Sequence, residues 1–183
     1  MHKLGKLKGD AWVEHSFAPL MRREMTGSGG SRVAAGVPSG EDGVFSKLLL
    51  ATQAPYHLLY VLHTPRGEGA AGRYQSPALD APELKHFLLR YRNLLKFDSR
   101  FDLWGHSAED QATVVWDRHN ILYAYGPLDL FEAELRSLGY SSGHVHVSFP
   151  HEHHYRSELD PLARSLLAHF DWTVSPLKPE DQQ

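Results

Sequence analysis

Hydrophobic residues along this chain fall into short runs that predict strands and longer amphipathic stretches that predict helices. The first regular run lies at 56–63 and reads YHLLYVLH. It is short, rich in aromatic residues and bounded by Pro55 and Pro65, which favours a strand over a helix. We therefore expect 56–63 to be the first strand of the core.

Three more runs predict strands in the middle of the chain. They read FDLWG at 101–105, ATVVWD at 112–117 and ILYAY at 121–125. The last two are joined by a short connection that ends in Asn120, and asparagine tolerates the positive φ that tight hairpin connections require. The sequence thus predicts a hairpin over 112–125.

The stretch 80–97 has the features of an amphipathic helix. Asp80 at the N-cap position and Glu83 three residues later form a capping box, and Pro82 falls in the first turn, where its missing N–H costs nothing. Helical spacing then places five apolar residues on one face: Leu84, Phe87, Leu88, Tyr91 and Leu94. We expect this face to be buried.

Two further helices and one strand are expected in the C-terminal half. Residues 128–138 carry apolar positions at helical spacing and stop at Gly139, a common residue type just past a helix end. Residues 144–149 alternate polar and apolar, as a half-buried strand does. Asp160, followed by proline, begins a third helix over 160–170.

This order of elements predicts an α+β domain. Strand, helix, strand, strand, helix and strand follow one another, which is the split βαβ order of ferredoxin-like folds, with an antiparallel sheet and helices mainly on one face. The run 101–105 would add an extra strand, and 160–170 a C-terminal helix. Such an arrangement leaves the other sheet face available for binding.

Composition divides the chain into three parts. Residues 1–43 contain one modest apolar patch and, from residue 26 onward, a Gly/Ser-rich linker, so we expect an N-terminal appendage. Residues 44–177 should form a single α+β domain, because 183 residues are too few for two comfortable cores. Residues 178–183 form a polar tail.

Overall composition argues against several classes of function. The formal net charge of −3 argues against a protein that binds nucleic acid or lies on an anionic membrane. The chain has no cysteine, which excludes disulfides, thiolate nucleophiles and cysteine-based zinc sites. The longest aliphatic run covers only 48–51, and no apolar segment follows the lysines at the N-terminus, so we expect a soluble cytoplasmic protein without a membrane segment.

Five of the thirteen histidines fall within one stretch, residues 143–155, which reads GHVHVSFPHEHHY. If 144–149 is a strand, its period of two places alternate residues on one face and the apolar residues between them on the other. The strand 121–125 would present two tyrosines on the same sheet surface. The predicted ligand-binding face therefore consists of Tyr123, Tyr125, His144, His146 and Ser148.

The same stretch offers ligands for a divalent transition metal. Imidazole suits zinc and nickel, and two histidines two positions apart on a strand can bind one ion together. Two known signatures do not fit, because HExxH would need histidine in place of Tyr155 and HxHxDH would need aspartate in place of Ser148. The candidate metal ligands are His144, His146, His151, His153 and His154.

A second group of polar residues occupies the connection at 117–120, which reads DRHN. A hydrogen-bonded hairpin turn explains such residues, and an Asp–His catalytic pair is the alternative interpretation. Farther upstream, the glycines of 67–72 match GxGxxG, but Pro77 leaves no room for the helix that a dinucleotide fingerprint needs. We interpret 67–72 as a loop.

Two functions are compatible with these features. The lack of a complete catalytic signature favours a non-catalytic binding or interaction protein, which would use the sheet face and the His-rich loop, need no cofactor and take a protein or a small molecule as partner. The alternative is a metal-dependent hydrolase in which the histidines hold zinc or nickel. Glu152 or Asp117 would then act as its general base.

Overall fold

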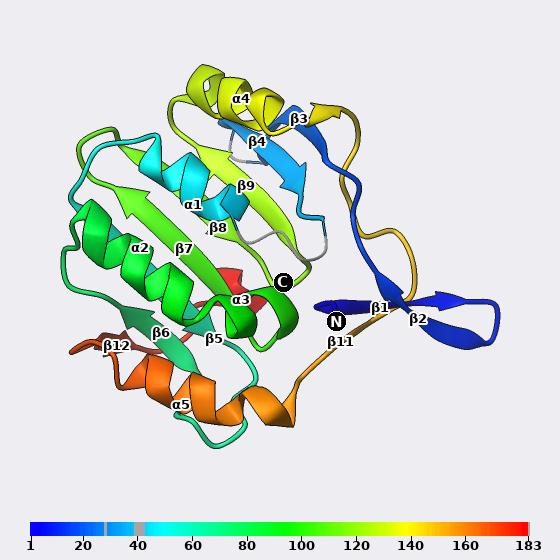
Figure 1. Cartoon of the computed structure of the whole chain (residues 1–183). Coiled ribbons are helices and arrows are strands. Elements are labelled where there is room, and N and C mark those ends of the chain that lie inside the picture. The colour runs from blue at the N-terminus through cyan, green and yellow to red at the C-terminus, as the bar shows by residue number, and fades with distance from the viewer. Residues whose placement is uncertain (28, 39–42, 183) are drawn as a thin grey trace.

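The computed structural model describes residues 1–27, 29–38 and 43–182, which form a mixed α+β fold with two sheets (Figure 1). The larger sheet contains β3 (Leu20–Met25), β4 (Ser31–Gly36), β5 (Tyr56–Leu62), β6 (Gly72–Gln75), β7 (Phe101–Ser107), β8 (Ala112–Trp116), β9 (Ile121–Tyr125), β10 (Ser141–Ser142) and β12 (Thr173–Ser175). The smaller sheet contains β1 (Leu4–Lys8), β2 (Ala11–His15) and β11 (His151–His153).

The two sheets are almost entirely antiparallel. The larger has the order β10-β3-β4-β9-β8-β7-β5-β6-β12, and the smaller has the order β11-β1-β2. Only the short β10 pairs in parallel, with β3, among the strands of the described residues. The predicted α+β class with an antiparallel sheet is confirmed.

The centre of the larger sheet consists of the strands predicted from hydrophobic runs, β5, β7, β8 and β9. The predicted hairpin joins β8 to β9, and Asn120 adopts the expected positive φ, 65°. Along each strand alternate residues are buried against the helices, as for Leu103 on β7, Val114 on β8 and Leu122 on β9. The alternation of apolar and polar residues along these strands thus predicts which face of the sheet packs against the helices.

The helices lie on one face of the larger sheet, as predicted (Figure 1). They are α1 (Gly43–Leu50), α2 (Ala81–Arg90), α3 (Arg92–Phe97), α4 (Leu128–Ser137) and α5 (Asp160–Leu167), with short 3-10 turns at Ser157–Leu159 and Pro179–Gln182. The capping box of Asp80 and Glu83 begins α2, with both hydrogen bonds at 2.8 Å. The predicted helix 80–97 is divided into α2 and α3 at Tyr91.

The N-terminal region contributes more to the larger sheet than its composition suggested. We expected 1–43 to be an appendage, but β4 pairs with β9 from Val33 to Gly36, and β3 pairs with β4. Val33 and Ala35 are buried in the main core. Burial of this apolar face explains why residues within the Gly/Ser-rich region form a strand.

The ferredoxin-like order is not confirmed, and the predicted strand 144–149 is not formed. The run at 101–105 became β7, a central strand between β5 and β8, and β4 occupies the position beside β9. Residues 143–150 form an irregular segment instead. Its polar residues are still exposed and the apolar residues between them are half-buried, so the predicted alternation of faces is present without the strand.

The smaller sheet joins the N-terminal hairpin to the strand at His151–His153. β1 pairs with β2 on one side and with β11 on the other. Gly5 stands opposite Glu152, and a Cβ at Gly5 would meet Oε1 of Glu152 at 2.8 Å, so a larger residue at position 5 would require the Glu152 side chain to move. In the part of the chain that is described, no helix has both the length and the apolar character required to cross a bilayer.

Candidate metal centre

The turn between β8 and β9 is fixed by its own polar side chains. Asp117 accepts the backbone N–H of Ile121 through Oδ1 at 2.8 Å, and the Asn120 side chain donates to the carbonyl of Val37 at 3.0 Å. These bonds hold His119 at the end of the hairpin, next to the smaller sheet. The turn therefore presents one imidazole from a rigid support.

β11 presents two imidazoles to the same region. Its pairing with β1 places His153 opposite Leu4 and His151 opposite Lys6. Because strand residues two apart share a face, His151 and His153 both point toward the hairpin turn, whereas Glu152 points to the other side. We expected two histidines on one face of a strand at 144–149. The structure shows this arrangement for His151 and His153 on β11 instead.

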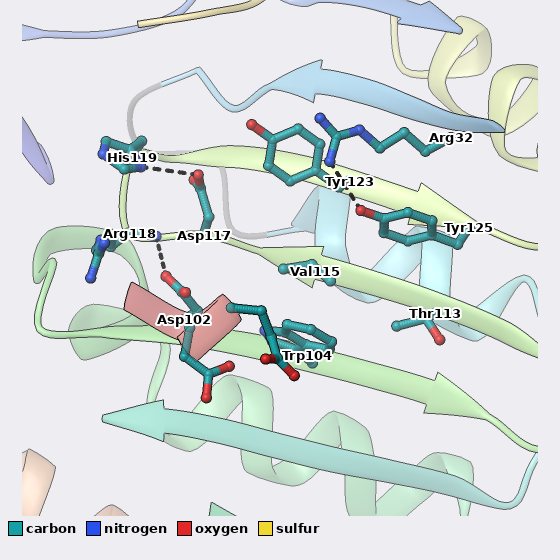
Figure 2. A pocket seen from close by; sticks show the side chains of 12 residues that line it. Arg32, Asp102, Trp104, Thr113, Val115, Asp117, Arg118, His119, Tyr123 and Tyr125 are labelled. Carbon is teal, nitrogen blue, oxygen red and sulfur yellow. Dashed lines mark hydrogen bonds and ion pairs between the residues drawn. The ribbon is translucent and has the colours of Figure 1, made fainter. Parts of the chain in front are cut away.

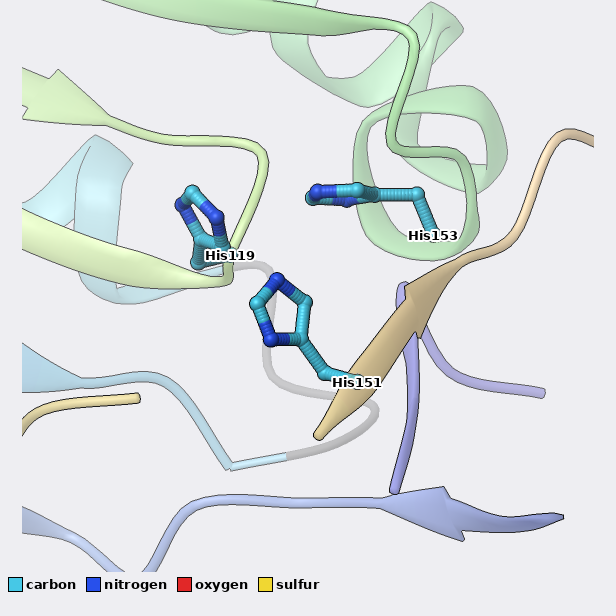
Figure 3. A group of neighbouring side chains, drawn as sticks. All are labelled: His119, His151 and His153. Atoms are coloured by element: carbon cyan, nitrogen blue, oxygen red, sulfur yellow. The ribbon is translucent and has the colours of Figure 1, made fainter. Parts of the chain in front are cut away.

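His119, His151 and His153 converge between the two sheets, and we call them the His triad (Figure 3). Their ring centroids form a nearly equilateral triangle with separations of 5.3, 5.0 and 5.4 Å. One nitrogen from each ring lies within 4.8 Å of the other two. Bonds of ~2.0–2.1 Å at tetrahedral angles place ligand nitrogens about 3.4 Å apart, so the three rings would have to turn toward a common point to share a zinc ion.

Hydrogen bonds orient two of these rings. Nδ1 of His119 lies 3.1 Å from Oδ2 of Asp117, and Nδ1 of His151 lies 3.2 Å from the carbonyl oxygen of Phe149. An imidazole that donates its Nδ1–H to such an acceptor has Nε2 free to bind a metal ion. Nδ1 of His153 is buried and has no hydrogen-bond partner among the residues described. A bound ion would satisfy such a nitrogen.

Burial keeps His153 in the form that binds metals. Desolvation by burial, together with smaller effects of His119, Arg118 and His151 and an opposing effect of Asp102, lowers the pKa of His153 to about 3. His153 is therefore neutral near pH 7, and neutral imidazole is the metal-binding form. The three residues could hold a metal ion.

The other predicted metal ligands lie outside the triad. His144 contacts the guanidinium of Arg22, and His146 lines a hollow beside Glu24. His154 lies on the other side of β11, where its Nδ1 is 3.0 Å from the carbonyl oxygen of His2. Of the five histidines singled out in the sequence, the structure brings two together with His119.

The two predicted tyrosines lie on the face of the larger sheet that turns away from the helices, together with Trp104, Thr113 and Val115. We call this the open face (Figure 2). The other members of the predicted binding face, His144, His146 and Ser148, are exposed in the irregular segment rather than aligned on a strand. His146 and Tyr123 nevertheless line one common hollow, so part of that face is close together.

A cleft of about 850 Å³ extends over the open face and reaches the His triad at His119. Its lining residues are Arg32, Asp102, Trp104, Thr113, Val115, Asp117, Arg118, His119, Tyr123, Tyr125, Glu180 and Asp181. Within it, Asp102 is bound on both oxygens, to Nε2 of His63 at 2.9 Å and to the backbone N–H of Arg118 at 2.7 Å. The cleft gives any ion in the triad a neighbouring site for a ligand.

His119 is the site residue that sequence reasoning did not assign to the metal. Its signal was the DRHN turn, interpreted either as a hairpin turn or as an Asp–His catalytic pair. Asp117 and His119 do contact each other, at 3.1 Å between Oδ2 and Nδ1, and His119 in addition faces two histidines from a remote strand. Only the pairing of β11 with β1 brings those rings to the turn.

Comparison with known proteins gives no family model, no curated protein and no solved structure that matches this chain.

Proposed function

We propose that this protein binds one divalent transition metal ion, zinc or nickel, through the His triad, and uses the ion to hold a ligand in the neighbouring cleft. The observation that carries this proposal is the convergence of three imidazoles from two sheets, with one nitrogen of each ring within 4.8 Å of the others. Chemically, three imidazoles suit zinc and nickel.

The surroundings of the triad support a bound ion. The carboxylate of Asp117 behind His119 corresponds to the carboxylate–histidine–metal arrangement that fixes ligand rings in metalloproteins. Three protein ligands leave a fourth position of a tetrahedral ion for water or another ligand. The cleft on the side of His119 is where that ligand would lie.

A binding role has more support than hydrolysis. Of the two candidate bases, Glu152 points away from the triad and its Oε1 lies 3.4 Å from Nε2 of His154. Asp117 is already engaged with His119 and with the backbone of Ile121. A general base must reach the metal-bound water, and these contacts leave both carboxylates poorly placed for that.

Equilibrium dialysis against zinc tests the proposal. The native chain should retain about one zinc ion, and the triple variant His119→Ala, His151→Ala, His153→Ala should retain none. The matched control carries His144→Ala, His146→Ala and His154→Ala and should bind zinc as the native chain does. Equal zinc content in the two triple variants would refute the proposed site.

A further inference from the structure

The floor of the cleft is apolar and partly aromatic. Trp104, Val115 and Tyr123 stand side by side on β7, β8 and β9, since Val115 is paired with both of the others. All three belong to the open face and line the cleft (Figure 2). Such a row offers a flat surface on which a planar apolar group can lie.

Trp104 and Tyr123 each bring a hydrogen-bond donor to this floor. Nε1 of Trp104 is buried and makes no hydrogen bond within the described chain. Burial, together with Asp117, raises the pKa of the Tyr123 hydroxyl, so it stays protonated as a donor. Because Nε1 of Trp104 is not accessible from the cleft, this ring offers a ligand its apolar face, and the hydroxyl of Tyr123 is the donor that a ligand can use.

Arg32 stiffens one wall of the cleft rather than offering a free cation. Its guanidinium lies 4.0 Å from the centre of the Tyr123 ring and donates to Glu24 at 2.7 Å and to the hydroxyl of Tyr125 at 3.1 Å. These contacts hold the Tyr123 ring in place.

With a divalent ion bound to three neutral imidazoles, the triad carries two positive charges, and the neighbouring Asp117 offsets one of them. The remaining charge favours an anion in the open coordination position. Tyr123 lines a hollow together with His119 and His151, and its hydroxyl could donate to a ligand bound there. A carboxylate has two oxygens, one for the ion and one for this hydroxyl.

We propose that the cleft binds a small aromatic carboxylate, with its acid group on the triad ion and its ring on Trp104 and Val115. This inference rests on the proposed metal site and specifies the class of ligand. The ring supplies apolar contact, and the ion and Tyr123 bind the acid.

Calorimetric titration of the zinc-loaded full chain tests this assignment. The probes are benzoate, 2-naphthoate and indole-2-carboxylate, each beside its primary amide, which keeps the ring and removes the charge. At least one acid should bind at least about tenfold more tightly than its amide, and the zinc-free chain should lose that preference. If no acid is preferred by a chain that holds zinc, the ligand class is wrong while the metal site stands; if the chain takes up no zinc, both fail.

Variants locate the ligand. Trp104→Leu should weaken binding of acid and amide about tenfold without loss of zinc, and Tyr123→Phe should weaken binding of the acid alone. Trp12→Leu is the matched control, because Trp12 is 48% exposed on β2 and does not line the cleft. Unchanged acid binding in both cleft variants would overturn the assignment.

Discussion

The rings of His119 and His153 lie 5.0 Å apart between centroids, although the two residues belong to different sheets. His119 ends a hairpin of the larger sheet, and His153 lies on β11 of the smaller one. An ion shared by these rings would connect the two sheets directly. Metal binding should therefore affect the stability of the fold as well as ligand binding.

Zinc should raise the midpoint of thermal unfolding. At a free zinc concentration about 100 times the dissociation constant, binding to the folded state alone adds about 2.7 kcal/mol. For a chain of this length that corresponds to about 5–10 °C. Differential scanning calorimetry with and without zinc measures the shift, and magnesium, which prefers oxygen ligands, should produce none. An equal shift with magnesium would contradict binding by imidazoles.

Asp117→Asn should weaken zinc binding while the other ligands remain. The carboxylate of Asp117 lies against Nδ1 of His119 and fixes the orientation of the ring, and loss of such partners costs roughly 10–100-fold in metal affinity. A competition assay with a chromophoric chelator measures the affinity. Asp171→Asn serves as the control, since Asp171 is exposed and outside the site. If both variants bind zinc as the native chain does, Asp117 does not support the metal.

Because of Lys3, the free energy of unfolding should change with pH in the alkaline range. It is only 1% exposed, with Nζ 4.4 Å from the centre of the Trp116 ring, and burial lowers its pKa to about 8 despite nearby carboxylates such as that of Asp117. Between this value and the ordinary 10.5, the unfolded chain binds more protons than the folded one, so the free energy of unfolding rises with pH.

Urea denaturation at pH 8 and pH 9.5 can isolate that effect. The native chain should gain about 2 kcal/mol relative to Lys3→Met over this interval, since one pH unit corresponds to about 1.4 kcal/mol per proton. Subtracting the variant removes the contributions of other titrating groups. The same pH slope in the native chain and the variant would show that Lys3 keeps an ordinary pKa.

Arg100 should be essential for folding stability. Its guanidinium is fully buried and contacts Asp98 at 2.8 Å, Glu68 at 3.0 Å and Asp160 at 2.8 Å. Arg100→Gln would leave buried carboxylates without a cation and should cost about 3–5 kcal/mol in the free energy of unfolding.

Arg66→Gln provides the comparison for Arg100. Arg66 also binds Asp160, but its side chain is 36% exposed, so the loss should stay below about 1 kcal/mol. Urea unfolding curves give both values. If the two variants lose similar amounts of unfolding free energy, burial does not determine how much each arginine contributes to the stability of the fold.

The elements that the sequence predicted correctly are those specified by local patterns. The alternation in β7, β8 and β9, the hairpin asparagine and the capping box of α2 all depend on neighbours within a few residues. β4 was missed because its Ala- and Gly-containing sequence resembles a linker, and only pairing with β9 and burial of Val33 make it a strand. Such long-range pairing has no local signature.

In the candidate site, too, some features follow from local sequence patterns and others from long-range strand pairing. His151 and His153 could be selected because they lie in the His-rich stretch, but they were expected in a loop rather than on a strand. The strand itself was expected at 144–149, because its alternation is stronger than that of β11, but the available partner edge belongs to β1 and pairs with His151–His153. His119 joins them only through this pairing, so its role could not be inferred from the turn alone.

X-ray absorption spectroscopy at the zinc edge tests the metal site most directly, because it reports the ligands of the ion itself. For the zinc-loaded native chain we predict about three imidazole nitrogens at ~2.0–2.1 Å and one further light ligand. Addition of a bound aromatic carboxylate should leave the imidazole count unchanged. A spectrum with no more than one imidazole, or an identical spectrum from the variant lacking His119, His151 and His153, would contradict the His triad as the metal centre.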